Sequence, residues 1–374
     1  MKALFFLLSS MNVGGVEKSF LGLLTTLPPE QYEIHLGLIH RRGGLLDQLP
    51  PYVYVHDIPV YNKLWPIIND PPRNTVRRLF KEGHLGEATV LFILYLWMKL
   101  TRSSYWTYRY LLRKEPPLDG EFDAAFAYAG PSQMIDYYIC EKVNAKQKYG
   151  WIHFDVSRFG IDRGMTRRLY RNYEKIFVVS KEARDIFCGI FPDFAGKTEV
   201  FYNIVNHDLV RRQAESAPTF NDDFTGNRIL TVGRISQEKG QQTAIRAMKL
   251  VLDKHPKTRW YFIGEGKDLA ACQALAHQEG LEGTIIFIGL QKNPYGYMRD
   301  CDLYVQPSHH EGYCITLAEA LCFNKPIVAT SFSGAREQLE GKADAWIAGF
   351  SPESLADRIN DALFFFDHHS TDKV

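Results

Sequence analysis

The sequence predicts an α/β protein built from two doubly wound parallel sheets. At 374 residues the chain is too long for one ordinary hydrophobic core and suits two α/β domains. Short apolar runs alternate with helical stretches in both halves, which is the pattern of parallel sheets. A polar segment over residues 206–227 separates the halves. We therefore expect domains over residues 1–205 and 206–350, followed by a helical segment over residues 351–374.

Composition excludes several classes of protein. The chain has 44 basic and 43 acidic residues, and a net charge of +1 argues against binding to nucleic acid through overall charge. Its 6 cysteines form no C-x-x-C pair or Cys/His cluster, so neither a zinc site nor a disulfide framework is predicted. A cytoplasmic location follows most simply. No transmembrane helix is expected, because the longest apolar run, residues 89–98, is about half of a membrane span.

The first forty residues open a parallel sheet. Residues 3–8 predict a buried first strand rather than a signal peptide, residues 9–15 a glycine loop, residues 16–27 a helix and residues 32–40 a second strand. Gly14 and Gly15 remove side chains where the backbone enters the helix, which leaves N–H groups open to an anion. A tight turn that binds nothing is the alternative.

Residues 71–115 differ from the rest of the first half. Nine Lys/Arg stand against three Glu, a local net charge of +6, and Trp and Tyr are interleaved with them. This pattern is typical of interfacial helices on an anionic membrane. It equally fits core helices with Lys and Arg stems lying along apolar surface.

Further strands are expected over residues 123–128, 148–153 and 175–179. Ligands of such sheets bind at the carboxyl ends of strands, which places His153 where it would meet a substrate. A lone histidine in an aromatic setting is more often structural.

The second half repeats the strand and helix alternation. Strands are expected over residues 228–232, 259–263, 284–288, 303–306 and 326–330, with a turn near Trp346 and helices that include residues 268–280 and 351–365. The loop 233–240 and the triplet Gly264-Glu265-Gly266 follow the first two of these strands.

The stretch HHEGYCITLAEA, residues 309–320, follows the strand over residues 303–306. Glu311 in a glycine turn and Glu319 in the opening of a helix suit a site that holds a nucleotide by backbone N–H groups and carboxylates. Thr316 and Glu319 also spell a capping box, so the pair could instead serve only to start the helix.

The motifs GRISQEKG, FIGEG and QPSHHEGYCITLAEAL together resemble the retaining glycosyltransferases of family 4. NVGGVEKS and WIHFD in the first half resemble the family more loosely. The resemblance implies the GT-B architecture, two Rossmann-like domains facing across a cleft. The first domain would take the acceptor, and the second a nucleotide-sugar donor.

The resemblance also implies roles for individual residues. Arg234 and Lys239 would offset the charge that develops on the diphosphate leaving group, Glu311 would lie near the donor sugar, and Glu319 would bind the ribose. His153 would position the substrates rather than act as a general base. The catalytic set is thus Glu311, His153, Arg234 and Lys239. The donor-binding set is Gly14, Gly15, Arg234, Lys239, Gly264, Glu265, Glu311, Gly312, Tyr313, Cys314, Ile315, Thr316 and Glu319.

These expectations describe a metal-independent retaining glycosyltransferase without a cofactor. Its partners would be a UDP- or GDP-type sugar donor and a glycan or lipid-linked glycan acceptor in cell-surface polysaccharide or lipid-linked glycan synthesis, with peripheral contact to the inner face of the membrane. The D-x-D triplet Asp300-Cys301-Asp302 is taken as a chance match, because no other feature of the metal-dependent fold accompanies it.

The sequence departs from the family pattern in two places, and two other functions compete with glycosyl transfer. The Asn-Gly pair frequent after the linker strand is absent, and the last helix, which in this fold packs back toward the first domain, is expected to be short. A GT-B epimerase or phosphorylase is the enzymatic rival, and a non-catalytic subunit that binds nucleotide sugars is the other.

Overall fold

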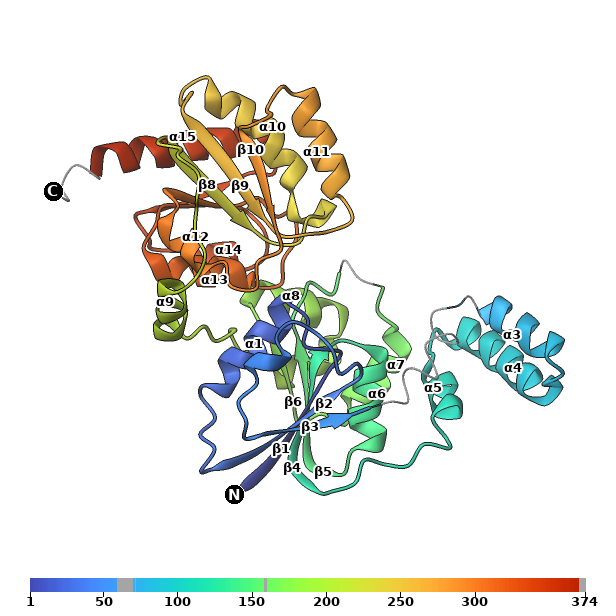
Figure 1. Ribbon diagram of the computed structural model, residues 1–374. Helices are drawn as coiled ribbons and strands as arrows, with labels where there is room; N and C mark the ends of the chain where they lie inside the picture. Colours follow the sequence, from blue (N-terminus) through green and yellow to red (C-terminus); the bar gives the residue numbers. More distant parts are fainter. Residues whose placement is uncertain (59–69, 71, 158–159, 370–374) are drawn as a thin grey trace. The chain divides into compact units, whose positions relative to one another are not determined.

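The computed structural model describes residues 1–58, 70, 72–157 and 160–369 (Figure 1). The chain forms two compact units, Met1–Tyr202 and Asn203–Val374. The sequence placed the boundary after residue 205, close to this division. Each unit is an α/β domain with its own parallel sheet and its own hydrophobic core, which confirms the predicted fold class.

The sheet of the first unit has seven strands in the order β3-β2-β1-β4-β5-β6-β7, and every pairing is parallel. The strands are β1 (Lys2–Leu8), β2 (Tyr32–Leu38), β3 (Val53–Asp57), β4 (Phe122–Gly130), β5 (Ala145–Ile152), β6 (Lys175–Val178) and β7 (Thr198–Val200). The edge strands β3 and β7 had not been predicted. Because β1, β4 and β5 are neighbours in the sheet, the loops after them leave from the same edge.

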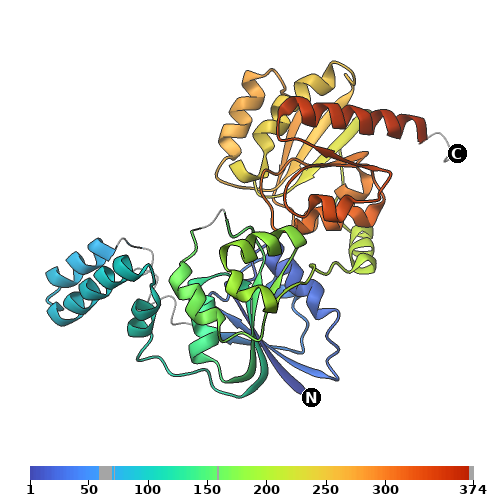
Figure 2. The same ribbon diagram turned by 180° about the vertical axis from the view of Figure 1, so that it is seen from behind.

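The helices of the first unit are α1 (Gly15–Leu24), η1 (Leu46–Gln48), α3 (Pro72–Lys81), α4 (Leu85–Thr101), α5 (Tyr105–Leu111), α6 (Gln133–Lys142), α7 (Arg163–Tyr170), α8 (Lys181–Ile190) and η2 (Pro192–Lys197). Helix α1 ends earlier than predicted, because the hydroxyls of Thr25 and Thr26 donate to Gly22 O and Leu23 O and close the last turn. Helix α6 packs on β4 and contributes five buried residues to the hydrophobic core. Helices α3 and α4 pack on each other and stand apart from the sheet (Figures 1 and 2).

Residues 71–115 were expected to form either helices on a membrane surface or core helices. The structure gives different answers for α4 and α5. Tyr105 and Tyr108 of α5 are buried in the core of the first unit, as the core reading requires. Helix α4 buries Ala88 and Leu91 and exposes a row of large apolar side chains, so it is not a core helix. Among the described helices, none combines the length and apolarity needed to cross a bilayer.

The second unit has a six-stranded parallel sheet in the order β10-β9-β8-β11-β12-β13. Its strands are β8 (Asn227–Val232), β9 (Thr258–Ile263), β10 (Ile285–Gly289), β11 (Leu303–Gln306), β12 (Ile327–Thr330) and β13 (Ala345–Ala348). The expected turn near Trp346 is wrong, since this residue lies within β13 and pairs with Val328 of β12.

The helices of the second unit are α9 (His207–Glu215), η3 (Gln237–Lys239), α10 (Gln241–Leu252), α11 (Leu269–Gln278), α12 (Tyr295–Asp300), α13 (Ile315–Ala320), η4 (Leu321–Phe323), α14 (Ala335–Leu339) and α15 (Pro352–His369). Helix α15 packs on α10 and on strands β11, β12 and β13. Leu355, Ile359 and Leu363 are completely buried in that contact. The last helix therefore belongs to the second unit.

Candidate active site

Two loops meet at the carboxyl edge of the second sheet. Residues 233–240 follow β8 and residues 307–314 follow β11, and these two strands are paired neighbours. The amide of His309 donates to Glu238 O at 2.8 Å, and that of His310 donates to the same oxygen at 3.3 Å. The motifs GRISQEKG and QPSHHEGYCITLAEAL thus lie against each other, at the edge where parallel sheets bind ligands.

Gly240 allows this close approach of the loops. Its φ of +72° lies in the left-handed region, and a Cβ there would stand 1.9 Å from Pro307 O. Only glycine fits, because any side chain would collide with backbone that cannot move aside. The last glycine of GRISQEKG is therefore required by the packing of the two loops.

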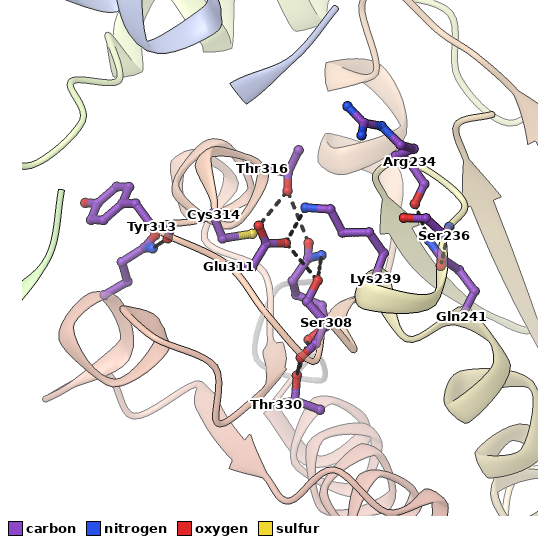
Figure 3. A network of polar contacts seen from close by, with 12 residues as sticks. Arg234, Ser236, Lys239, Gln241, Ser308, Glu311, Tyr313, Cys314, Thr316 and Thr330 are labelled. Carbon is purple, nitrogen blue, oxygen red and sulfur yellow. Dashed lines mark hydrogen bonds and ion pairs between the residues drawn. The ribbon is translucent and has the colours of Figure 1, made fainter. Parts of the chain in front are cut away.

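Lys239 and Glu311 form an ion pair across the two loops (Figure 3). Lys239 Nζ lies 2.5 Å from Glu311 Oε1, and the side chains are 23% and 9% exposed. Burial alone would lower the pKa of Lys239, but the negative charge of Glu311 outweighs burial, so the pKa is raised. Lys239 is thus a fixed cation at neutral pH.

A series of hydrogen-bonded polar side chains orients Glu311. Ser308 Oγ donates to Glu311 Oε1 at 2.8 Å, and Gln306 Nε2 donates to Ser308 Oγ at 2.8 Å. Thr330 Oγ1 donates to Ser308 O and holds that residue in place. Both contacts to Glu311 use Oε1, and no described residue hydrogen-bonds its Oε2. One carboxylate oxygen is therefore available to a ligand.

Arg234 supplies a second cation beside this pair. The side chain is exposed, and no described residue forms an ion pair with it. Its backbone is fixed, because Gln241 Nε2 donates to Arg234 O at 2.8 Å and Ile235 is completely buried. The charge of Arg234 also acts on Lys239, whose pKa it tends to lower. Arg234 and Lys239 are two cations with the carboxylates of Glu238 and Glu311 beside them, and a guanidinium and an ammonium group together suit a diphosphate.

The helix that follows Glu311 begins at Ile315. Its N-cap residue is Cys314, with φ +66° and no side-chain capping hydrogen bond. Thr316 lies inside the first turn, and its Oγ1 donates to Gln306 Oε1 at 3.2 Å. The predicted capping box is therefore wrong. The amides of Gly312, Ile315 and Thr316 donate to no residue in the described part of the chain, so they are open to an anion.

Glu319 lies on the buried side of α13. It is 3% exposed, and Tyr295 OH donates to its Oε1 at 2.6 Å. Burial and the nearby carboxylate raise the pKa of Tyr295, so the phenol keeps its proton and remains a donor to Glu319. Glu319 thus serves the packing of α12 on α13 in addition to any contact with a ribose.

The triplet Gly264-Glu265-Gly266 packs against the loop 233–240, which carries Arg234 and Lys239. A Cβ on Gly264 would lie 2.0 Å from Gly233 O, and one on Gly266 would lie 2.0 Å from Ile235 O. The amide of Ile235 donates to Glu265 O at 2.9 Å, while the Glu265 side chain is exposed. Both glycines are thus required to seat the loop that carries Arg234.

The predicted site residues of the first unit lie along the carboxyl edge of its sheet. Gly14 is the N-cap of α1, and a Cβ on Gly15 would meet nothing within 4 Å. Ser19 of α1 hydrogen-bonds Tyr128 of β4 at 2.7 Å, and the Tyr128 ring packs on His153 with centroids 4.7 Å apart. Tyr128 therefore links helix α1 to His153.

His153 is buried among aromatic rings. Its ring lies nearly parallel to that of Trp151, and neither ring nitrogen has a partner among the described residues. Burial lowers the pKa of His153 to about 3, so the ring is neutral at physiological pH. A neutral imidazole of this kind is a poor proton acceptor.

Sequence reasoning missed the residues that support Glu311. Gln306 and Ser308 are completely buried polar residues at the end of an apolar strand, and that position was the available signal. The D-x-D triplet has structural partners: Asp302 Oδ2 accepts from the amide of Arg228 at 2.8 Å, and Asp300 pairs with Arg299. Within the described residues, no group of three or more His, Cys, Asp or Glu could hold a metal ion.

Comparison with known proteins finds one family model that matches the part of the chain carrying this site. Residues 214–364 match the family model of the glycosyl transferases group 1. That range contains Arg234, Lys239, Glu311 and Glu319, so the second half is similar to these glycosyl transferases over the residues that carry the candidate site.

Relatives by sequence match over part of their length. One is an N-acetylgalactosamine-N,N'-diacetylbacillosaminyl-diphospho-undecaprenol 4-alpha-N-acetylgalactosaminyltransferase of Campylobacter jejuni, 32% identical over 179 residues, which are 47% of each chain. Another is an uncharacterized glycosyltransferase of Methanocaldococcus jannaschii, 28% identical over 177 residues, which are 46% of this chain and 43% of that one. The chain spans about half the length of the curated relatives it matches.

Solved structures match the whole chain in fold. HepE of Anabaena in complex with UDP aligns with a TM-score of 0.65 and 18% identity over 99% of this chain and 92% of its own. TarM of S. aureus, in a complex that includes UDP, aligns with a TM-score of 0.65 and 13% identity over 97% and 93%. These neighbours are GT-B glycosyltransferases, so the predicted fold of two Rossmann-like domains is confirmed.

Proposed function

We propose that the chain is a retaining glycosyltransferase of the family 4 type that moves a sugar from a UDP- or GDP-type donor to a glycan acceptor. The observation that carries this proposal is the Lys239–Glu311 pair beside the exposed Arg234, on loops that also present open amides. Cations, a carboxylate and N–H groups together match the parts of a nucleotide sugar.

The diphosphate end of the donor fits the positive side of the site. When the bond from the anomeric carbon to the phosphate oxygen breaks, its electron pair stays on the diphosphate. Arg234 and Lys239 are permanent positive charges that stabilise this developing negative charge. They perform the work that a divalent metal performs in other transferases, and a metal-independent reaction without a cofactor is therefore part of the proposal.

The sugar end fits Glu311. Its Oε2 faces no described partner and can accept a hydrogen bond from a sugar hydroxyl or stabilise positive charge at the anomeric carbon. The acceptor oxygen then forms the new bond on the face that the phosphate leaves, and the acceptor proton passes to the leaving phosphate oxygen. Retention of configuration follows from attack on that face.

His153 takes a positioning role in this proposal. Its low pKa, caused by burial, makes it too weak a base to remove the acceptor proton. Its ring packs against those of Tyr128 and Trp151 at the sheet edge that also carries Gly14 and Gly15. Gly15 leaves room for a sugar phosphate to approach the start of α1.

The related proteins direct the choice of substrates to test. HepE was solved with UDP and with UDP-glucose, so UDP-sugars come first and GDP-sugars second. The Campylobacter relative is named for a diphospho-undecaprenol-linked glycan, and a Rhizobium relative for lipopolysaccharide core biosynthesis. Both names favour an acceptor in cell-surface polysaccharide or lipid-linked glycan synthesis. Its use at the cytoplasmic face of a membrane is part of our proposal.

Donor turnover tests the proposal. The full chain is incubated with each nucleotide sugar, with and without glycan acceptors, and release of nucleoside diphosphate is measured by chromatography for the wild type and for Glu311→Ala. We expect turnover of at least one donor by the wild type and its loss in Glu311→Ala, while the variant still binds that donor.

Other outcomes identify the rivals. Donor binding without turnover would indicate a non-catalytic subunit. Conversion of the donor sugar without any acceptor would indicate an epimerase, and release of sugar phosphate from glycan and inorganic phosphate would indicate a phosphorylase.

A further inference from the structure

A pocket in the first unit lies between the starts of helices α6 and α7. The two helices pack on each other there (Figure 1). The pocket encloses about 300 Å³, part of it open to solvent, which is at the small end of the range for ligand sites. Its lining includes Pro131, Gln133, Asp136, Phe154, Asp162 and Thr166.

The pocket shares the carboxyl edge of the first sheet with His153. Phe154 of the lining follows His153 in the chain, and Pro131 follows Gly130, whose carbonyl oxygen accepts from the His153 amide at 3.4 Å. Strands β4 and β5 are paired neighbours, so both lining segments leave the sheet at the same edge. Parallel sheets bind their ligands at this edge, and the pocket is therefore placed as a substrate site is.

Thr166 brings an unpaired hydroxyl to the pocket. The residue is only 7% exposed, yet its Oγ1 has no hydrogen-bond partner in the part of the chain that the structure describes. A threonine in a helix ordinarily places its hydroxyl on the carbonyl three or four residues earlier, and Thr166 does not. Because an unpaired buried hydroxyl costs free energy, a hydroxyl group of a ligand in the pocket would stabilise it.

Gln133 and Asp162 add a donor and acceptors. Gln133 Oε1 accepts from Tyr108 OH at 3.3 Å, which leaves the Nε2 amide of Gln133 without a partner among the described residues. The two carboxylate oxygens of Asp162 accept from the amides of Met165 and Ser104, and each oxygen keeps a second lone pair. Donors and acceptors in this mixture suit the hydroxyl groups of a sugar.

The charges at the pocket are negative. Among the described residues that line it there is no Lys, Arg or His, whereas Asp136 and Asp162 are both part of the lining. Arg163 and Arg167 of α7 are exposed and lie outside the lining. A ligand with a carboxylate or phosphate would therefore place its charge near a carboxylate with no counterion at hand, which costs binding free energy.

We propose that this pocket holds one uncharged sugar residue of the glycan acceptor, with Thr166 and Gln133 on its hydroxyl groups and its apolar face against Phe154. The inference rests on the proposed function and adds the chemical class of the acceptor sugar, a hexose or N-acetylhexosamine and not a uronic acid or a sugar phosphate. Thr166 and Gln133 determine acceptor specificity and take no part in breaking the donor bond. The volume of the pocket suits one sugar residue.

Binding of glycosides without a donor tests the pocket by itself. The full chain is titrated with aryl glycosides of neutral hexoses, of N-acetylhexosamines and of glucuronic acid, and binding is measured by saturation-transfer NMR. We expect at least one neutral glycoside to bind, and the glucuronide to bind at least about tenfold more weakly. Acceptor KM and kcat are then measured with any donor that the chain turns over.

Thr166→Val removes the hydroxyl and keeps the shape of the side chain. We expect it to weaken glycoside binding and to raise the acceptor KM about three- to tenfold, with kcat unchanged. Its thermal unfolding should stay the same or move to higher temperature, because an unpaired buried hydroxyl is lost. Thr75→Val is the matched control, since Thr75 of α3 is also buried with an Oγ1 that has no described partner, and it should bind glycosides like the wild type.

Gln133→Lys tests the charge preference by reversing it. Gln133 is exposed, so a lysine is accommodated there, and its ammonium group would supply the missing counterion. We expect this variant to bind the glucuronide about two- to fivefold more tightly than the wild type does.

Three results would overturn the proposal. They are a wild type that binds none of the glycosides, a wild type that binds the glucuronide as well as the neutral sugars, and a Thr166→Val variant that binds like Thr75→Val. Glycoside binding that depends on Thr166 in a chain that turns over no nucleotide sugar would support the pocket and contradict the proposed function. Donor turnover with no glycoside binding would do the reverse.

Discussion

Glu311 both fixes Lys239 and keeps an oxygen for the donor. In Glu311→Gln the shape of the side chain is kept, but the charge that raises the pKa of Lys239 is lost. We expect transfer to fall by at least about 100-fold, because charge stabilisation in the transition state is removed, while diphosphate binding persists. Steady-state kinetics would show this as a loss of kcat. The exposed Glu340→Gln is the control, and an equal loss in that variant would point to general destabilisation.

Cys314 occupies a backbone conformation that favours glycine. Its φ is +66° at the start of α13, and the left-handed region costs a side-chain-bearing residue roughly 1–2 kcal/mol. We expect Cys314→Gly to leave the free energy of unfolding unchanged or raise it by up to about 1 kcal/mol. Cys272→Gly, inside α11, should instead lower it by more than about 1 kcal/mol. Denaturant unfolding of both variants measures the difference, and a matching loss in the two would contradict the strain.

Asp136 makes the stability of the first unit depend on pH. Burial raises the pKa of its carboxyl to about 7, although Tyr173, Ser132 and Tyr170 donate hydrogen bonds to it. A raised carboxyl pKa means that the folded state binds the proton more tightly than the unfolded state. Stability is therefore lost as pH rises from about 4 to about 7, by roughly 4 kcal/mol at most. Asp136→Asn should flatten this dependence, measured by urea unfolding between pH 5 and pH 8. An unchanged slope would show that Asp136 titrates normally.

At the scale of elements, the segment before β8 is held by one carboxylate. Asp222 accepts hydrogen bonds from Tyr261 at 2.6 Å, Arg228 at 2.7 Å and Arg259 at 3.0 Å. Burial alone would raise the pKa of Asp222, but the hydrogen bonds from Tyr261 and Arg228 outweigh it and lower the pKa to about 2.

Asp222→Asn should therefore destabilise the second unit by about 1–2 kcal/mol at pH 7, after allowance for solvent screening. A lowered carboxyl pKa stabilises the fold above the unfolded value, so the difference from wild type should shrink as pH falls from about 4 toward 2. Thermal unfolding at both ends of that range provides the measurement. Asp223→Asn at the neighbouring exposed position serves as the control.

Apolar runs predicted most strands, and the missed ones have physical explanations. Strand β7 has three residues, too few for a periodic signal, and β13 was taken for a turn because a short AWIA run lies among polar residues. Strand β3 has alternating apolar and polar residues in VYVHD, a pattern from which the strand was predictable. Edge strands depend on pairing with a neighbour that is distant in sequence, so local pattern identifies them poorly.

The site was predictable in its charged residues and less so in its supports. Arg234, Lys239 and Glu311 stand in recognisable motifs, and the structure brings Lys239 and Glu311 into contact. The capping box failed because Cys314 adopts a left-handed conformation and starts the helix before Thr316. No local sequence pattern predicts the left-handed conformation of Cys314. The loop that contains it packs against α14, where Gln338 Nε2 donates to Tyr313 O.

At the scale of the whole molecule, charge is distributed unevenly along a nearly neutral chain. Although the net charge is only +1, cations cluster on α3 in the first unit, and Arg234 and Lys239 stand together in the second. The first set faces solvent on a helix, and the second lies at the carboxyl edge of a sheet. Added salt should therefore weaken the attraction of both sets for anions, because Arg234 is exposed like the cations of α3.

Calorimetric titration of the full chain with nucleoside diphosphates tests the donor site most directly. We predict that UDP or GDP binds the wild type, that the corresponding nucleoside binds far more weakly, and that Arg234→Gln weakens diphosphate binding by about tenfold or more. Arg246→Gln, exposed on α10, should bind like the wild type. Failure of both diphosphates to bind, or equal affinity in Arg234→Gln and wild type, would contradict a donor site built on Arg234, Lys239 and Glu311.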